Sequence, residues 1–344
     1  MMNLQQKNVW FYNDDYPSTL TSAEMSDPLA MINQFFQTYS LPQAKRYLWQ
    51  AIKYTLTDIS TPANELRPTF YRFTIEIERI VDSAWVLQKS LPTKKTFGPD
   101  QFSKDYLTRI QNEDFISFLN GSEISNPSKA IHDFFNYASL CSWKKSCLED
   151  MRKTIVDSSY GLYFDSHSLA DFVGFSKLSK LLEGLFLLLD RFGYHLDHKI
   201  HREHNNWCTS QSDDFIHWLG EYVKKNATHV SLQHLANICY AHRFHHDWNG
   251  YNTHKIFESY ENVLQVTHAA VHVINRNEVN NRTTDTKKNM DRFKKWSPGR
   301  ITRFVSNLLI TSRTFERSYK RYVQPQKEID LLTQLIYLAY KIHI

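Results

Sequence analysis

Apolar residues recur along most of the chain with the spacing of an α-helix. Two sets of four lie at positions i, i+3, i+4 and i+7, which places each set on one helical face. They are Ile32, Phe35, Phe36, Tyr39 and Ile131, Phe134, Phe135, Ala138. The same criterion predicts further helices near residues 43–57, 68–88, 142–157, 168–191, 215–223, 230–242 and 256–274. Asp27 and Asn126 each precede a proline, so each is predicted to cap a helix whose first residue is that proline.

The two apolar sets belong to a longer internal similarity. Residues 13–60 align without gaps to residues 112–159 at an offset of 99, and 16 of the 48 aligned positions are identical. With two residues inserted, the match continues from Ile77 and Trp85 to Leu178 and Phe186. We interpret this similarity as a duplication of a three-helix unit.

Composition agrees with a helical chain. The 344 residues include nine glycines and ten prolines, and no proline lies between Pro127 and Pro298. The glycines are too far apart for a phosphate loop, a dinucleotide fingerprint or a nucleophile elbow, so no nucleotide cofactor is expected. We therefore predict an all-α protein with duplicated three-helix units followed by a larger helical C-terminal region, in a helical-repeat or bundle-like architecture.

The pattern suggests five segments. Residues 1–90 form the first repeat unit, 91–111 a connector with a short helix, and 112–200 the second unit. Residues 201–275 form a His-rich helical region and residues 276–344 a basic helical region. The four cysteines have no C-x-x-C spacing, and neither a signal peptide nor a membrane span is recognisable. We expect a cytoplasmic protein with reduced thiols and no membrane association.

Eleven of the 16 histidines lie between His195 and His254. If two of these segments pack together, their imidazoles could bind zinc. The candidate ligands are His198, His201, His242, His245 and His246. No H-E-x-x-H motif is present, so packed or exposed histidines without a metal are the simpler interpretation, and no cofactor is the primary expectation.

Arg191 and His198 suggest a second kind of catalytic site, that of a metal-independent helical RNase. The arginine would hold the scissile phosphate while the histidine acts as acid or base. The residue after the arginine is Phe192, where such a pair usually has a polar side chain. This observation weakens the enzymatic hypothesis.

Positive charge is concentrated near the C-terminus. Between Arg276 and Arg321, thirteen basic and four acidic residues give a net charge of +9, whereas the remainder of the chain carries −4. Such a segment suits phosphates, and Phe293 and Trp296 within it could stack on bases. The predicted nucleic-acid-binding residues are Lys287, Lys288, Arg292, Lys294, Lys295, Arg300, Arg303, Arg313, Arg317, Lys320 and Arg321.

The leading interpretation is a non-enzymatic adaptor or binding protein with a protein partner. A duplicated helical module without a nucleotide loop or a recognisable catalytic set is typical of such proteins. Nucleic-acid binding through the basic segment is the first alternative. A His-based metal-dependent enzyme or a helical RNase is the second.

The nucleic-acid alternative makes a direct prediction. If Arg313, Arg317 and Arg321 contact phosphates, their joint replacement by glutamate abolishes RNA or DNA binding, and binding by the unmodified chain weakens steeply with salt. Fluorescence anisotropy with a labelled oligonucleotide at several salt concentrations measures both effects. Unchanged binding by the triple variant would contradict this alternative.

Overall fold

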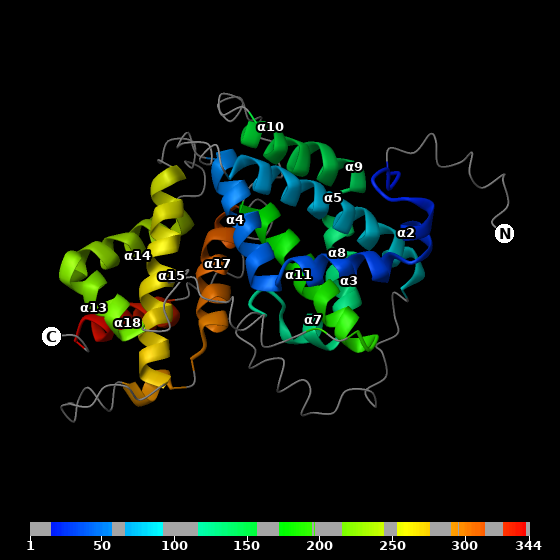
Figure 1. The fold of residues 1–344 in the computed structure, drawn as a ribbon. Coiled ribbons are helices and arrows are strands. Elements are labelled where there is room, and N and C mark those ends of the chain that lie inside the picture. Colours follow the sequence, from blue (N-terminus) through cyan, green and yellow to red (C-terminus); the bar gives the residue numbers. More distant parts are fainter. Residues whose placement is uncertain are drawn as a thin grey trace. The chain divides into compact units, whose positions relative to one another are not determined.

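The computed structural model describes residues 15–56, 66–91, 116–156, 172–194, 196, 215–243, 253–275, 290–294, 296–313 and 326–341. Every regular element in these ranges is helical, which confirms the all-α prediction. The chain divides into two compact units, unit 1 (Met1–His204) and unit 2 (Asn205–Ile344). We describe each unit by itself (Figure 1).

In the described part of unit 1, the first set contains four helices. They are α2 (Ser22–Ser26), α3 (Pro28–Thr38), α4 (Leu41–Leu56) and α5 (Arg67–Ser90). Thr21 and Glu24 form a capping box at the start of α2, which satisfies two backbone N–H groups. Asp27 accepts a hydrogen bond from the Ala30 N–H, as predicted for the cap of α3.

A second set of helices follows in unit 1. They are α7 (Gly121–Ser125), α8 (Pro127–Tyr137), α9 (Leu140–Trp143), the π-helix η2 (Lys144–Glu149), α10 (Asp150–Val156) and α11 (Phe172–Arg191). Asn120 and Glu123 form the capping box of α7. Asn126 occupies the predicted cap position of α8, but its side chain makes no capping hydrogen bond. The predicted cap position of Asn126 is therefore confirmed, whereas the capping hydrogen bond expected from its side chain is not formed.

Helix boundaries in the two sets recur at the offset seen in the sequence. The starts and ends of α2 and α3 lie 99 residues before those of α7 and α8, and α4 and α9 start 99 residues apart. The duplication itself remains a prediction, but this correspondence provides pairs of equivalent positions. For the long helices α5 and α11 the offset is 101, since Ser90 and Arg191 end them.

Equivalent aromatic residues join the two sets reciprocally. Phe36 of α3 packs edge-to-face on Phe186 of α11, with ring centroids 5.5 Å apart. Trp85 of α5 and Phe135 of α8 make the equivalent contact at 5.0 Å. Helix α11 thus packs against α3 and α4 of the first set as well as α8 of its own. The core of unit 1 is shared by both sets of helices.

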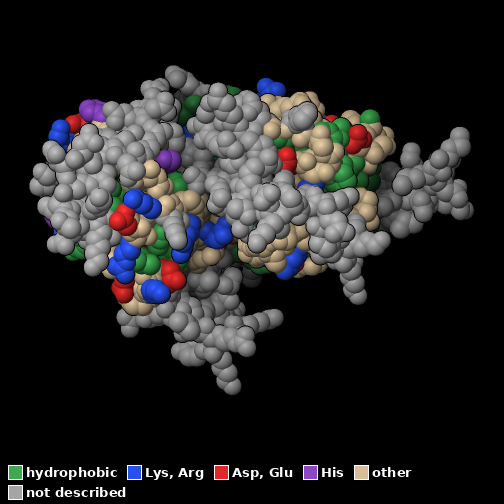
Figure 2. All heavy atoms as spheres, turned by 90° about the horizontal axis from the view of Figure 1, so that it is seen from below, with side chains coloured by type: hydrophobic (Ala, Val, Ile, Leu, Met, Phe, Trp, Pro, Cys, Tyr) green, Lys and Arg blue, Asp and Glu red, His purple; other side chains and the backbone are tan. Residues whose placement is uncertain are grey.

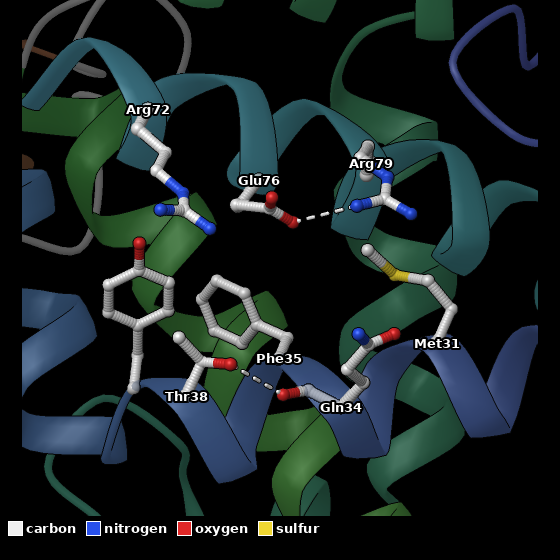
Figure 3. A pocket seen from close by; sticks show the side chains of 8 residues that line it. Met31, Gln34, Phe35, Thr38, Arg72, Glu76 and Arg79 are labelled. Carbon is white, nitrogen blue, oxygen red and sulfur yellow. Dashed lines mark hydrogen bonds and ion pairs between the residues drawn. The ribbon is translucent and has the colours of Figure 1, made fainter. Parts of the chain in front are cut away.

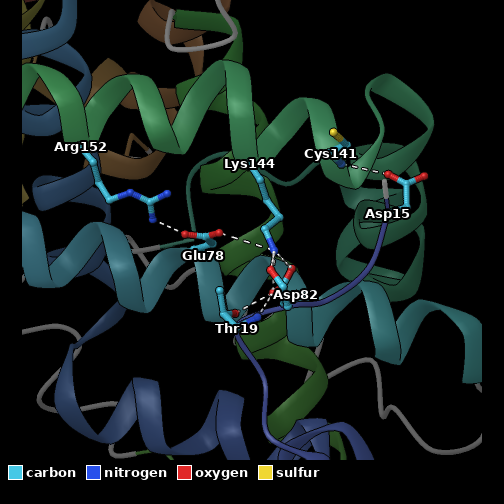
Figure 4. A network of polar contacts seen from close by, with 8 residues as sticks. Asp15, Thr19, Glu78, Asp82, Cys141, Lys144 and Arg152 are labelled. Atoms are coloured by element: carbon cyan, nitrogen blue, oxygen red, sulfur yellow. Dashed lines mark hydrogen bonds and ion pairs between the residues drawn. The ribbon is translucent and has the colours of Figure 1, made fainter. Parts of the chain in front are cut away.

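Buried ion pairs join the two sets in the same reciprocal way. Lys45 Nζ of α4 lies 2.7 Å from Glu183 Oε1 of α11, with side chains 3% and 0% exposed. Glu183 also accepts the backbone N–H groups of residues 117–119. At the equivalent positions, Lys144 Nζ lies 3.0 Å from Asp82 Oδ2 of α5, and the Thr19 N–H donates to the same oxygen (Figure 4). Each carboxylate is therefore compensated by a lysine from the other set.

The Asp82 pair lies within a wider network on α5. Glu78 contacts Lys144 at 3.5 Å and forms a further ion pair with Arg152 of α10 (Figure 4). Burial raises the pKa of Asp82, while the hydrogen bonds from Thr19 and Lys144 oppose this rise. The network connects α5 to the segment that contains the π-helix.

Unit 2 consists of helices arranged around one central helix. They are α13 (Phe215–Lys225), α14 (Thr228–Arg243), α15 (Thr253–Asn275), α17 (Pro298–Arg313) and α18 (Gln326–Lys341). Helix α15 packs against each of the other four. Its buried polar groups find partners on those helices: Tyr260 OH lies 2.7 Å from Ser306 Oγ, and His268 Nε2 lies 3.0 Å from Thr302 Oγ1. The core of unit 2 therefore combines apolar packing with hydrogen bonds between helices.

The reciprocal ion pairs predict a large effect of a single substitution. Lys45→Met leaves Glu183 buried without its cation and should lower the unfolding free energy of the chain by about 3–5 kcal/mol. Lys153→Met removes one partner of an exposed pair with Glu149 and should cost less than about 0.5 kcal/mol. Urea denaturation followed by tryptophan fluorescence measures both. Equal destabilisation by the two substitutions would refute this role of Lys45.

His268 predicts a pH dependence of stability. Burial, followed by the charge of His272, lowers its pKa from 6.5 to about 3, so the folded chain keeps the imidazole neutral. Below pH 6.5 only the unfolded state gains the proton, and stability falls as the pH drops toward 3. Between pH 7 and pH 5, the unmodified chain should lose about 2 kcal/mol more of its unfolding free energy than the His268→Gln variant loses. Urea titrations at both pH values test this, and equal losses would contradict it.

Candidate functional site

The predicted metal ligands lie mostly outside the described residues. His198, His201, His245 and His246 fall there, and His242 belongs to α14 with a side chain that is also outside the description. Within the described part of the chain, no group of three His, Cys, Asp or Glu side chains could hold a metal ion. The zinc hypothesis therefore remains a prediction.

Arg191 has a structural contact that the sequence did not reveal. Its Nη2 donates to the backbone oxygens of Ile124 and Ser125, at 2.5 and 3.1 Å. These carbonyls end α7 and have no partner within that helix, so the guanidinium caps them. Its proposed catalytic partner His198 lies outside the described residues. The RNase hypothesis thus remains a prediction, with its arginine already bound to backbone.

The described residues of the basic segment make contacts within unit 2. Arg292 Nη1 donates to Gln334 Oε1 at 2.8 Å, and Lys294 pairs with Asp291 at 2.6 Å. The guanidinium of Arg300 lies 4.9 Å from the centre of the Trp296 ring, and Arg303 belongs to α17. The remaining predicted nucleic-acid contacts lie outside the residues whose side chains are described: Lys287, Lys288, Lys295, Arg313, Arg317, Lys320 and Arg321.

One expectation about this segment was wrong. Phe293 and Trp296 are only 1% and 6% exposed, so neither ring can stack on a base. Both belong to the core of unit 2, with their centroids 5.6 Å apart. On the face shown in Figure 2, basic and acidic side chains lie beside one another. The aromatic part of the nucleic-acid hypothesis therefore does not hold.

Unit 1 contains a groove between α3 and α5, which we call the α3–α5 groove (Figure 3). It has a volume of about 80 Å³. Its lining residues are Met31, Gln34, Phe35, Thr38, Tyr39, Arg72, Glu76 and Arg79. Arg79 is anchored by Glu76 at 3.1 Å and by an ion pair with Glu24 of α2. Both apolar and polar side chains of α3 line the groove, and its charged residues come from α5.

Arg72 differs from Arg79 in having no partner in the described part of the chain. Among the described residues, no hydrogen bond or ion pair engages its guanidinium, which points from α5 into the groove (Figure 3). Burial raises the pKa of Tyr39, and the positive charge of Arg72 opposes that rise. The guanidinium is therefore available to an anionic group that enters the groove.

Helix α5 and the residue before it carry exposed apolar side chains. Tyr71 and Ile75 are 42% and 36% exposed, and they lie one turn apart on α5. Leu66, just before the helix, is exposed as well. Arg72 and Glu76 immediately follow Tyr71 and Ile75 in the sequence. Helix α5 thus carries exposed apolar side chains directly before two of the residues that line the groove.

A second groove occupies the equivalent place between α8 and α11, which we call the α8–α11 groove. Its volume is about 350 Å³. Its lining residues are Glu123, Ala130, Asp133, Phe134, Asn136, Tyr137, Lys177 and Lys180. Ala130 stands where the first groove has Met31, so a smaller side chain leaves more space. The Lys180–Glu123 ion pair, at 2.9 Å, is the counterpart of Arg79–Glu24.

Charge distinguishes the two grooves at equivalent positions. Gln34 corresponds to Asp133, and Glu76 corresponds to Lys177. Lys177 Nζ lies 4.8 Å from the centre of the Tyr137 ring. Burial lowers the pKa of Lys177, and the neighbouring Lys180 lowers it further, against the influence of Asp133. The two grooves are formed by equivalent helices and contain an equivalent ion pair, but the charges of their other lining residues differ.

Comparison with protein-family models, with curated proteins and with solved structures finds no match to this chain. No helix in the described ranges has both the length and the apolar character needed to cross a membrane. The sequence-based candidates did not include the groove residues Arg72, Asp133 and Lys177. Only Asp133 lies within the aligned residues, where it stands opposite Gln34, whereas Arg72 and Lys177 lie outside them.

Proposed function

We propose that the protein is a non-enzymatic binding protein whose α3–α5 groove docks an acidic segment of a protein partner. The observation that carries this proposal is the guanidinium of Arg72, which points into the groove and has no partner among the described residues. An arginine binds a carboxylate in a bidentate geometry, and such charge-assisted hydrogen bonds are stronger than neutral ones.

The size and surroundings of the groove support a side chain as the anionic group. A volume of about 80 Å³ admits a carboxylate and its neighbouring carbon atoms but not a whole nucleotide. On the same helix α5, Tyr71 and Ile75 offer exposed apolar area that a partner's aliphatic or aromatic residue can cover. Arginine and tyrosine are also residue types enriched at the centres of protein interfaces.

The reactive groups that the structure describes favour binding over catalysis. Burial raises the pKa of the Cys239 thiol to about 11, which keeps it protonated and unreactive at neutral pH. Burial likewise lowers the pKa of His268 to about 3, so it does not exchange protons near pH 7.

A peptide-binding experiment tests the groove. The probe is a fluorescein-labelled twelve-residue peptide in which Asp and Leu alternate, titrated with the full chain and followed by fluorescence anisotropy. Arg72→Ala removes the charge that the carboxylate needs and should weaken binding about tenfold or more. Tyr71→Ser should weaken it several-fold through the loss of apolar area.

The controls separate a local effect from a general one. Lys153→Ala removes one positive charge from α10 and should leave the affinity unchanged. A peptide with Lys in place of Asp should not bind. Equal affinity of the Arg72→Ala variant and the unmodified chain, equal binding of the Lys peptide, or no binding of the acidic peptide would each overturn the proposal.

A further inference from the structure

The α8–α11 groove contains two opposite charges that do not pair. Lys177 projects from α11 and Asp133 from α8, and both line the cavity. No ion pair or hydrogen bond of either side chain is found among the described residues. The ammonium of Lys177 instead lies over the Tyr137 ring, 4.8 Å from its centre. Each side chain is half-buried in the lining of the groove.

The other two charged residues of the groove are already compensated. Lys180 Nζ lies 2.9 and 3.2 Å from the two carboxylate oxygens of Glu123. Glu123 in turn accepts the Asn120 N–H in the capping box of α7. The Lys180–Glu123 pair therefore has a structural role in holding α7 against α11. Lys177 and Asp133 are the charges left to meet a ligand.

The volume of the groove fits a small molecule. About 350 Å³ lies at the lower end of the range typical of ligand pockets. The exposed side chains of Asn136 and Tyr137 add an amide and an aromatic ring at its edge. Burial and the adjacent Lys180 lower the pKa of Lys177, and the carboxylates of Asp133 and Glu123 oppose this decrease.

We propose that the α8–α11 groove binds an amino-acid-sized zwitterion. The ligand's carboxylate lies against Lys177, and its ammonium lies against Asp133. A ligand with both charges satisfies both side chains at once, whereas a simple anion or cation leaves one of them unpaired in a half-buried place. Asn136 can donate to the carboxylate or accept from the ammonium. Tyr137 offers its ring to an apolar part of the ligand.

The α3–α5 groove provides an internal comparison. At the positions equivalent to Asp133 and Lys177 it has Gln34 and Glu76, and its volume is smaller. At these two positions it therefore lacks the pair of opposite charges that a zwitterion needs. The inference does not depend on the proposed docking of an acidic segment, because the two sites use different side chains on different helices.

Isothermal titration calorimetry of the full chain tests the proposal. The probes are glycine, β-alanine, γ-aminobutyrate, L-lysine, L-glutamate and L-phenylalanine, which vary the distance between the charges and the side chain. At least one of them should bind saturably. Its N-acetyl derivative, which lacks the ammonium, and its amide, which lacks the carboxylate, should each bind about tenfold or more weakly.

Two variants assign the two ends of the ligand. The Asp133→Asn variant should bind the zwitterion and its N-acetyl derivative with similar affinity, because the partner of the ammonium is gone. The Lys177→Met variant should bind the zwitterion and its amide with similar affinity, because the partner of the carboxylate is gone. Gln34→Asn, at the position in the other groove equivalent to Asp133, and Arg72→Ala should leave zwitterion binding unchanged. Thermal unfolding of each variant checks that it is folded, and the derivative series on the unmodified chain needs no variant.

A peptide arm identifies the source of the zwitterion. A hexapeptide with blocked termini and adjacent Lys and Glu side chains carries both charges on a protein segment. If the chain binds the free compounds more tightly, the ligand is a small molecule. If it binds the hexapeptide more tightly, the ligand is a protein segment with adjacent opposite charges. Either result supports the charge arrangement. The proposal is overturned if no probe binds saturably, or if removing either charge of the probe has no effect.

Discussion

Two buried lysine–carboxylate pairs hold unit 1 together, and the rest of its architecture depends on them. Lys45 and Lys144 lie at equivalent positions, and each reaches a carboxylate on the long helix of the other set. A buried carboxylate without its cation is strongly destabilising, so the two sets of helices are coupled through charge as well as through apolar packing. The backbone N–H groups bound by Glu183 and Asp82 extend this coupling to the segments before α7 and α2. If one set of helices moved relative to the other, a lysine or carboxylate of these pairs would lose its partner or become exposed.

This coupling explains why the two grooves share a frame and differ in chemistry. The inner faces of α5 and α11 are committed to the reciprocal contacts, whereas the edges that face α3 and α8 tolerate changes of charge and size. In each groove one basic residue is anchored to the capping-box glutamate: Arg79 to Glu24, and Lys180 to Glu123. The residues beside the anchored pair then decide what the groove can bind. Arg72 favours a carboxylate, and Lys177 with Asp133 favours a zwitterion.

Individual residues show how far the sequence could lead. The helix starts at Pro28, Pro127 and Pro298 follow from capping residues and prolines, which act within a single turn. Phe293 and Trp296 were predicted as base-stacking residues because lysines and arginines flank them, yet both rings are buried. Alternating basic and aromatic residues look the same in a sequence whether the helix turns its aromatic side inward or outward. Arg191 poses a similar problem, because its carbonyl partners, Ile124 and Ser125 at α7, lie 67 and 66 residues earlier in the chain and belong to no local motif.

The sequence by itself determined the helical class, the positions of most helices and the correspondence between residues 13–60 and 112–159. Those features depend on interactions between residues three or four positions apart, or on similarity that alignment detects directly. Only the tertiary structure decided that Lys45 meets Glu183, 138 residues away, and that Arg72, Lys177 and Asp133 line grooves without partners among the described residues. Such contacts depend on which helices pack side by side. The free energy of that packing is distributed over the whole core and is not encoded in any local pattern.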